Sequence, residues 1–239
     1  MSTSASESLN VITDFQQIAE AWVASKEGKY ALESVRTTEF VLQSIAQGEP
    51  ISVEAFADFS GLTLKEAKVQ YRQMRMSGAD FDEAGRLIGN ALTMRPTRNM
   101  LMMDGRTLYA WCALDTLFLP GLVGKTATVQ SVSPISGETI QLTVSPEGIQ
   151  SFDPPDLVLS VVVPGVSRAC ELGRPGGAQG EVCRAMHFFA NRQEAEEYLG
   201  AGTDVAILTV EQAAELAQLA WVRPYRSVVE SADKLAAER

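Results

Sequence analysis

The sequence predicts an α+β protein, in which an N-terminal helical, winged-helix-like module precedes a mixed α/β core with antiparallel strands. Two observations predict this class. Apolar residues recur at helical spacing in several segments of residues 11–76. Between residues 126 and 163 they alternate with polar residues, as in hairpin strands. The 239 residues suffice for one sizeable core, or for a small domain attached to a larger one.

Four helical segments are expected first, each ended by a glycine or started by a capping residue: residues 11–26, 35–47, 52–59 and 63–76. Thr63 and Glu66 have the spacing of a capping box at the start of the fourth helix. The tight turn at Gly61 gives the last two helices a helix-turn-helix arrangement. Strand-like stretches at 86–94 and 99–105 follow, and they would serve as its wing.

The second half of the sequence is expected to begin with strands. The strands expected are residues 126–132, 139–144, 149–152 and 157–163. The last of them is apolar on both faces, which indicates a central strand. The glycine-rich residues 165–181 are interpreted either as a mobile cover over a site or as an insertion without function. The remaining elements expected are a strand, a helix, a strand, a helix and a charged, frayed helical tail, at residues 182–190, 191–200, 204–208, 209–221 and 231–239.

Composition and charge exclude several classes of function. The net charge of −10 argues against broad nucleic-acid binding and against an anionic membrane surface. No stretch is long and apolar enough to span a bilayer. The first ten residues lack the basic segment and apolar core of a signal peptide. A cytoplasmic protein without nucleic-acid or membrane partners is therefore expected.

Three cysteines and one histidine limit the chemistry. Cys112, Cys170 and Cys183 are an odd, sparse set, unlike a secreted disulfide framework, so free thiols are expected. His187 is the only histidine, which removes most histidine-based catalytic schemes. If a short helix starts at Cys112, Asp115 shares its face, with Cβ atoms about 5–6 Å apart. A thiol and a carboxylate at that distance can exchange a proton.

The motifs around these residues resemble a known family. LYAWCALDTL at 108–117, followed by a proline and by GKTATV at 124–129, resembles the alkylmercury (organomercurial) lyases of bacterial mercury resistance. The resemblance continues at LTVSPEGIQ (142–150), CRAMHFFAN (183–191) and ILTVEQAAELAQ (207–218). Several motifs in the same order are far more specific than any one of them.

The resemblance implies an enzyme and its catalytic set. Cys112 and Asp115 of the AWCALD motif, together with Cys183 before the HFF segment, match the family's catalytic residues, which hold mercury as substrate and product. It implies cleavage of the carbon–mercury bond of organomercurials to a hydrocarbon and Hg(II), without an organic cofactor. It also implies external thiols for product release and mercuric reductase as a downstream acceptor. The parts expected are an N-terminal extension with a helix, a winged-helix-like domain that serves the enzyme, and a mixed α/β catalytic lyase core, at residues 1–33, 34–104 and 105–239.

The residue types suit this reaction. Thiolate sulfur is the natural ligand of a soft metal, and two thiolates that donate to mercury weaken its bond to carbon. The carbon leaves readily only when it is protonated, which requires an acid beside the metal. Because aspartic acid has an ordinary pKa of about 3.9, Asp115 must take a proton from an incoming thiol or have its pKa raised by burial. Tyr109 and Trp111 are interpreted as packing residues that could line an apolar pocket for the organic group.

Three other interpretations stay open. The chain could be a homologue that reuses the fold and the thiols for another metal or thiol task. It could be a metal-responsive winged-helix regulator, whose basic residues on the fourth helix face phosphates. On one side of a strand, Cys183 and His187 could bind zinc with Cys112 or Cys170. Cys170 is otherwise either a spare thiol that captures mercury or merely an exposed cysteine.

Overall fold

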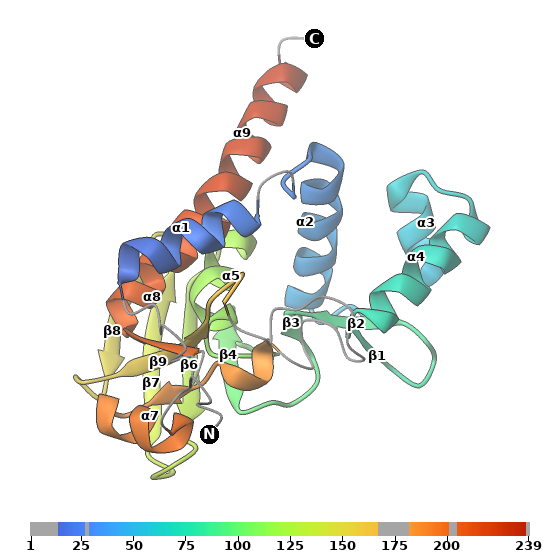
Figure 1. The fold of residues 1–239 in the computed structure, drawn as a ribbon. Helices are drawn as coiled ribbons and strands as arrows, with labels where there is room; N and C mark the ends of the chain where they lie inside the picture. The colour runs from blue at the N-terminus through green and yellow to red at the C-terminus, as the bar shows by residue number, and fades with distance from the viewer. Residues whose placement is uncertain (1–13, 27–28, 167–181, 201–204, 238–239) are drawn as a thin grey trace, which may run out of the picture.

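The computed structural model describes residues 14–26, 29–166, 182–200 and 205–237. These residues form a large and a small antiparallel sheet, with helices packed around them (Figure 1). This arrangement confirms the predicted α+β class with antiparallel strands. None of the described helices is long and apolar enough to cross a membrane.

Four helices begin the described chain: α1 (Phe15–Ser25), α2 (Leu32–Ala46), α3 (Val53–Ser60) and α4 (Leu64–Met76). Their caps confirm local signals in the sequence. Ser52 accepts a hydrogen bond from the N–H of Ala55 at the start of α3, and Thr63 and Glu66 form the predicted capping box on α4. Gly61, with a φ of 63°, makes the left-handed turn between α3 and α4. These two helices form a hairpin that stands apart from the other helices (Figure 1).

The large sheet has eight strands in the order β1-β2-β3-β5-β4-β6-β7-β8, and every neighbouring pair is antiparallel. Its strands are β1 (Asp80–Phe81), β2 (Leu87–Asn90), β3 (Leu92–Thr93), β4 (Asn99–Met103), β5 (Arg106–Ala110), β6 (Ala127–Val132), β7 (Thr139–Ser145) and β8 (Gly148–Asp153). The strands expected as a wing, β2 to β4, are thus continuous with the strands of the predicted core. The boundary predicted after residue 104 falls in the turn between β4 and β5, and the division into domains stays a prediction.

The small sheet has the order β10-β9-β11. Its strands are β9 (Val158–Val162), β10 (Phe188–Phe189) and β11 (Val205–Thr209). All five residues of β9 are buried, which confirms the predicted central strand. The strand predicted over 182–190 is wrong except for β10, because Cys183–Ala185 forms a short 3-10 helix, η2. Ser160 explains this irregular path: its hydroxyl donates to the carbonyl of Ala185 and accepts from the N–H of His187, which replaces part of the strand ladder.

The C-terminal helices are α7 (Arg192–Leu199), α8 (Val210–Ala217), the π-helical turn η3 (Gln218–Val222) and α9 (Arg223–Ala237). Asn191 caps α7, and Thr209 forms a capping box with Gln212 on α8, both as predicted. Helix α9 continues through the region predicted as a frayed tail. Helix α1 packs against α8 and η3, so the N-terminal helix lies on the C-terminal helices (Figure 1).

Helix α5 (Asp115–Val123) occupies the centre of the fold. All nine of its residues are buried, including Pro120, which lies inside the helix. It contacts α2, α8, η3, β7 and β8. Burial on every side explains why its sequence, DTLFLPGLV, is apolar all round after the first turn. The first residue of α5 is therefore held inside the protein.

Candidate active site

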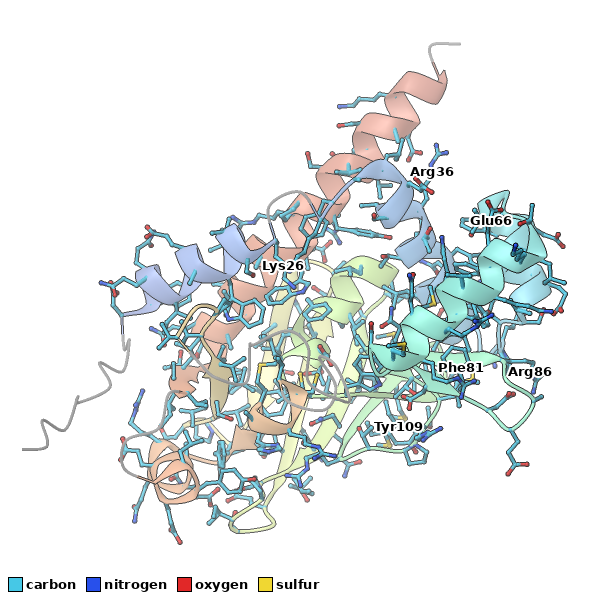
Figure 2. All side chains as sticks on the ribbon, turned by 45° about the vertical axis from the view of Figure 1, so that its right-hand side comes forward. Lys26, Arg36, Glu66, Phe81, Arg86 and Tyr109 are labelled. Carbon is cyan, nitrogen blue, oxygen red and sulfur yellow. The ribbon has the colours of Figure 1, made fainter. Side chains whose placement is uncertain are left out.

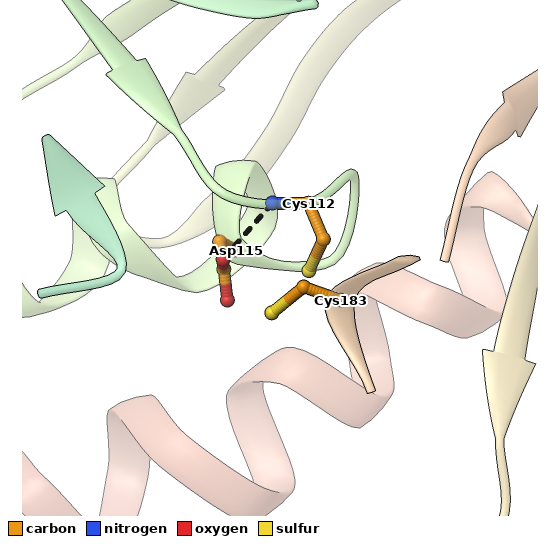
Figure 3. Close-up of side chains that lie close together, drawn as sticks. All are labelled: Cys112, Asp115 and Cys183. Atoms are coloured by element: carbon orange, nitrogen blue, oxygen red, sulfur yellow. Dashed lines mark hydrogen bonds between the residues drawn. The ribbon is translucent and has the colours of Figure 1, made fainter. Parts of the chain in front are cut away.

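Cys112 and Asp115 lie at the junction between β5 and α5. The helix starts at Asp115, three residues later than the expected start at Cys112. Cys112 lies in the preceding turn, and its backbone N–H donates a hydrogen bond of 3.1 Å to Oδ2 of Asp115 (Figure 3). The carboxylate therefore folds back over the turn and lies beside the Cys112 thiol.

Cys183 belongs to a segment much later in the sequence, but it lies at the same place. It is the first residue of η2, and the following Met186 accepts a hydrogen bond of 3.3 Å from the N–H of Ala113. This contact joins the segment of η2 to the turn that contains Cys112. Cys183 consequently faces Cys112 and Asp115 (Figure 3).

The three predicted site residues form one buried cluster. The two Sγ atoms and a carboxylate oxygen of Asp115 lie within 4.8 Å of one another. Residues Cys112, Asp115 and Cys183 are 1%, 7% and 8% exposed. Among the described residues, this is the one group of three or more His, Cys, Asp or Glu side chains placed to hold a metal ion. Two thiols and a carboxyl group suit a soft metal.

Burial changes the acidity of two members of the cluster. It raises the pKa of Asp115 from 3.8 to about 6, although hydrogen bonds from Cys112 and the charge of Lys26 act in the opposite direction. Burial, the neighbouring Cys183 and the charge of Asp115 also raise the pKa of the Cys112 thiol well above its ordinary value. At neutral pH Cys112 is therefore a thiol, and Asp115 can take up a proton easily.

His187 and Cys170 do not join this cluster in the described part of the chain. His187 packs edge-on against the rings of Phe189 and Tyr198, and burial lowers its pKa to about 4. Because residues 183–185 form a turn, Cys183 and His187 do not share one side of a strand, and the zinc hypothesis loses its geometric basis. Cys170, with most of the glycine-rich segment, lies outside the described residues.

A cavity of about 510 Å³ opens beside Asp115 and Cys183. It is lined mainly by aromatic and aliphatic side chains from α1, α2, α5 and η3, with Trp111 and Tyr225. The sequence indicated Trp111 as a lining residue and Tyr109 as well, but Tyr109 is not part of the lining. Trp111 is held by a hydrogen bond of 2.8 Å from its indole N–H to the buried carboxylate of Asp80.

Helix α1 is the part of the site that the sequence did not indicate. Trp22 and Lys26 line the cavity, and the indole N–H of Trp22 donates a 2.9 Å hydrogen bond to the carbonyl of Val162 in β9. The hydroxyl of Tyr30 donates to the carbonyl of Ala220 in η3. A buried tryptophan near the end of an amphipathic helix was the available signal, but it does not identify its partner.

Comparisons with known proteins agree with this geometry. The family model of the alkylmercury lyases matches residues 92–222, which include all three clustered residues. The alkylmercury lyases of Staphylococcus epidermidis and Bacillus cereus are each 34% identical to this chain, over 74% and 77% of it and 77% and 79% of their own length. That of Pseudomonas putida is 33% identical over 75% of this chain and 80% of its own.

A solved structure shares the fold. The crystal structure of the mercury-bound form of MerB2 superposes with a TM-score of 0.68 and 20% sequence identity, and the match covers 89% of this chain and 99% of that one. The architecture described above is therefore that of a known fold.

Proposed function

This chain belongs to the alkylmercury lyase family and is an organomercurial lyase, and we propose that its catalytic residues are Cys112, Asp115 and Cys183. The overall reaction replaces the carbon–mercury bond by a carbon–hydrogen bond, R–Hg⁺ + H⁺ giving R–H + Hg²⁺. The observation that carries the assignment is the single buried cluster in which two thiols and a carboxyl group approach within 4.8 Å.

The first step is capture of the organomercurial by a thiol. Mercury coordination lowers the pKa of a thiol and displaces its proton. Because Asp115 lies beside Cys112 and has a pKa of about 6, it receives this proton and becomes a carboxylic acid. The raised pKa of Cys112 keeps the proton on sulfur until mercury arrives.

The second step cleaves the bond. Cys183 binds the same mercury ion, and its proton leaves with the displaced ligand, for example as a free thiol R′SH. Two sulfur donors increase electron density on the metal and weaken its bond to carbon. Asp115 then donates its proton to the carbon, which leaves as R–H. The balance is R–Hg–SR′ plus two cysteine thiols giving R–H, R′SH and mercury bound between Cys112 and Cys183.

Product release requires external thiols in this scheme. Hg(II) bound by two buried thiolates leaves by exchange with further thiol ligands, because free Hg(II) is a poor alternative to a thiolate complex. Atoms and charge balance with the side chains and the substrate alone, so no organic cofactor is required. A thiol-rich cytoplasm and mercuric reductase as acceptor suit this step, and we include both in the proposal.

The test is hydrocarbon release from phenylmercuric acetate with excess 2-mercaptoethanol, measured as benzene by gas chromatography. Wild type is expected to release benzene, and Cys112→Ser, Asp115→Asn and Cys183→Ser to lose at least about 100-fold in rate, the usual minimum for a positioned proton donor. Cys170→Ser is the matched thiol control and is expected to retain the wild-type rate. Retained activity in any of the first three variants would contradict the assignment of that residue.

A further inference from the structure

We propose that Lys26 makes this site selective for arylmercurials whose ring carries a carboxylate. This inference rests on the proposed function and extends it to the organic group of the substrate. In this reading Lys26 is a specificity-determining residue, and the carbon–mercury bond itself is cleaved by the three residues above. Figure 2 shows Lys26 at the C-terminal end of α1.

An aromatic wall begins one helical turn from the acid. Phe118 follows Asp115 by three residues on α5, which places both side chains on one face. The ring of Phe118 stacks on Trp221, with centroids 5.0 Å apart and planes 1° apart. Trp221 in turn contacts Trp22, with centroids 4.9 Å apart. An organic group attached to mercury at the cluster extends along this wall, and a flat ring gains most from such contacts.

Lys26 lies at these rings. Its Nζ atom is 4.5 Å from the ring centroid of Trp221 and 5.2 Å from that of Trp22, both within cation–π distance. The two contacts hold the ammonium group beside the aromatic wall. Lys26 also lines the cavity, together with Asp115 and Cys183. A ring placed against the wall therefore brings its substituents close to a fixed positive charge.

The charges of the lining favour an anionic substituent. Among the described residues that line the cavity, Asp115 is the one acidic residue, and Lys26 and Lys29 are the basic ones. Asp115 is uncharged while it carries the proton taken from Cys112, so at that stage the charged side chains of this lining are the two lysines. The whole chain carries a net charge of −10, so an anionic substrate needs such a local positive charge to enter.

A role for Lys26 in proton transfer alone explains its position less well than a role in binding the substrate. The charge of Lys26 is the smallest of the influences on the pKa of Asp115, which burial dominates.

The size of the cavity also fits a substituted ring. An apolar cavity of about 150 Å³ admits benzene, and the cavity here has about 510 Å³.

The experiment compares two substrates in the same neutral thiol. Values of kcat/KM are measured for 4-(hydroxymercuri)benzoate, from benzoate release, and for phenylmercuric acetate, from benzene release, with excess 2-mercaptoethanol. The ratio of the two values cancels any effect of Lys26 on Asp115, because both substrates use the same proton. Lys26→Met is expected to lower this ratio roughly five- to tenfold, mainly through KM, as for the loss of one partly exposed ion pair.

The controls separate charge from structure. Lys26→Arg is expected to restore the ratio, and Lys26→Gln to lower it as Lys26→Met does, with circular dichroism confirming that each variant is folded. Lys68→Met makes the same change of net charge on the exposed face of α4 and is expected to leave the ratio unchanged. An unchanged ratio in both neutral Lys26 variants overturns the inference. If wild type cleaves neither substrate, the proposed function itself fails, which is a different result.

Discussion

Two carboxylates near helix N-termini show how differently two regions of this protein treat the same group. Asp115, the first residue of α5, accepts a hydrogen bond from the N–H of Cys112, and Glu66, in the first turn of α4, accepts one from the N–H of Thr63. Burial raises the pKa of Asp115 to about 6. Hydrogen bonds from the side chain and backbone of Thr63 lower the pKa of the exposed Glu66. Local geometry is similar, so burial decides whether the carboxylate is a proton donor or a cap.

The contrast extends to the surroundings of both groups. Every residue of α5 is buried, whereas the α3–α4 hairpin exposes large apolar side chains such as Phe59 and Met76. The cavity wall is formed by residues of α1, α2, α5 and η3, and both α1 and α5 contact η3. Substitutions in the cavity wall should therefore change both stability and activity, and matched substitutions in the hairpin should change neither much.

The largest effect is expected for Trp22→Ala in the cavity wall. Trp22 is 6% exposed, contacts Trp221 and donates its indole N–H to Val162. Its removal is expected to lower the free energy of unfolding by roughly 3–5 kcal/mol and to reduce benzene release. Phe59→Ala is the matched change in the hairpin, where Phe59 is 45% exposed and stacks on Phe40. It should lower stability by about 1 kcal/mol and leave benzene release unchanged. Equal losses in urea denaturation would contradict the contrast.

Local signals in the sequence predicted the helices well. The caps at Ser52, Thr63 and Thr209 act over three residues, so the residues that make the bond stand together in the chain. The central placement of β9 followed from a stretch that is apolar on both faces. The cluster of Cys112, Asp115 and Cys183 was predicted from flanking motifs.

Long-range contacts account for what the sequence did not predict. The apolar residues of 186–190 favoured a strand, but the hydroxyl of Ser160, more than twenty residues earlier, binds the backbone there and permits a turn at Cys183. The role of α1 depends on Trp22 meeting Val162, 140 residues away. No periodicity within α1 could identify that partner. The contacts of Trp22 and Lys26 with Trp221 could therefore be found only from the three-dimensional structure.

A smaller effect is expected for Gly121→Ala in α5. A Cβ at Gly121 would lie 2.6 and 2.7 Å from the two Cγ atoms of Val222 in η3, and the fully buried valine has little freedom to move. The free energy of unfolding should fall by roughly 2–3 kcal/mol, and benzene release should fall because Trp221 is displaced with its neighbour. Gly61→Ala in the hairpin meets no atom within 4 Å and is strained only by its φ of 63°, which costs about 1 kcal/mol without affecting activity. Similar activity in the two variants would show that η3 tolerates displacement.

An effect on stability that is smaller than that of Gly121→Ala, and of opposite sign, is expected for Asp115→Asn. At pH 7 the folded protein holds an ionised carboxylate in a buried place, and a pKa raised from 3.8 to about 6 means that this ionisation opposes folding. The neutral amide removes this cost and should increase the free energy of unfolding by about 1–2 kcal/mol, because its weaker hydrogen bond with the N–H of Cys112 offsets part of the gain. Activity should be lost in the same variant, so the site would hold its proton donor at the expense of stability.

The pH dependence separates this effect from simple repacking. Because the folded pKa of Asp115 lies above the unfolded value, wild type loses stability relative to Asp115→Asn as pH rises from about 4 to about 6, and the difference is constant above pH 7. Glu66→Gln should behave oppositely: the folded pKa of Glu66 is lowered, so its contribution to stability is present above pH 4.5 and is lost in acid. Urea denaturation between pH 3 and 7.5 measures both. If Asp115→Asn is less stable than wild type at pH 7, the ionised carboxylate does not oppose folding, which contradicts a pKa raised by burial.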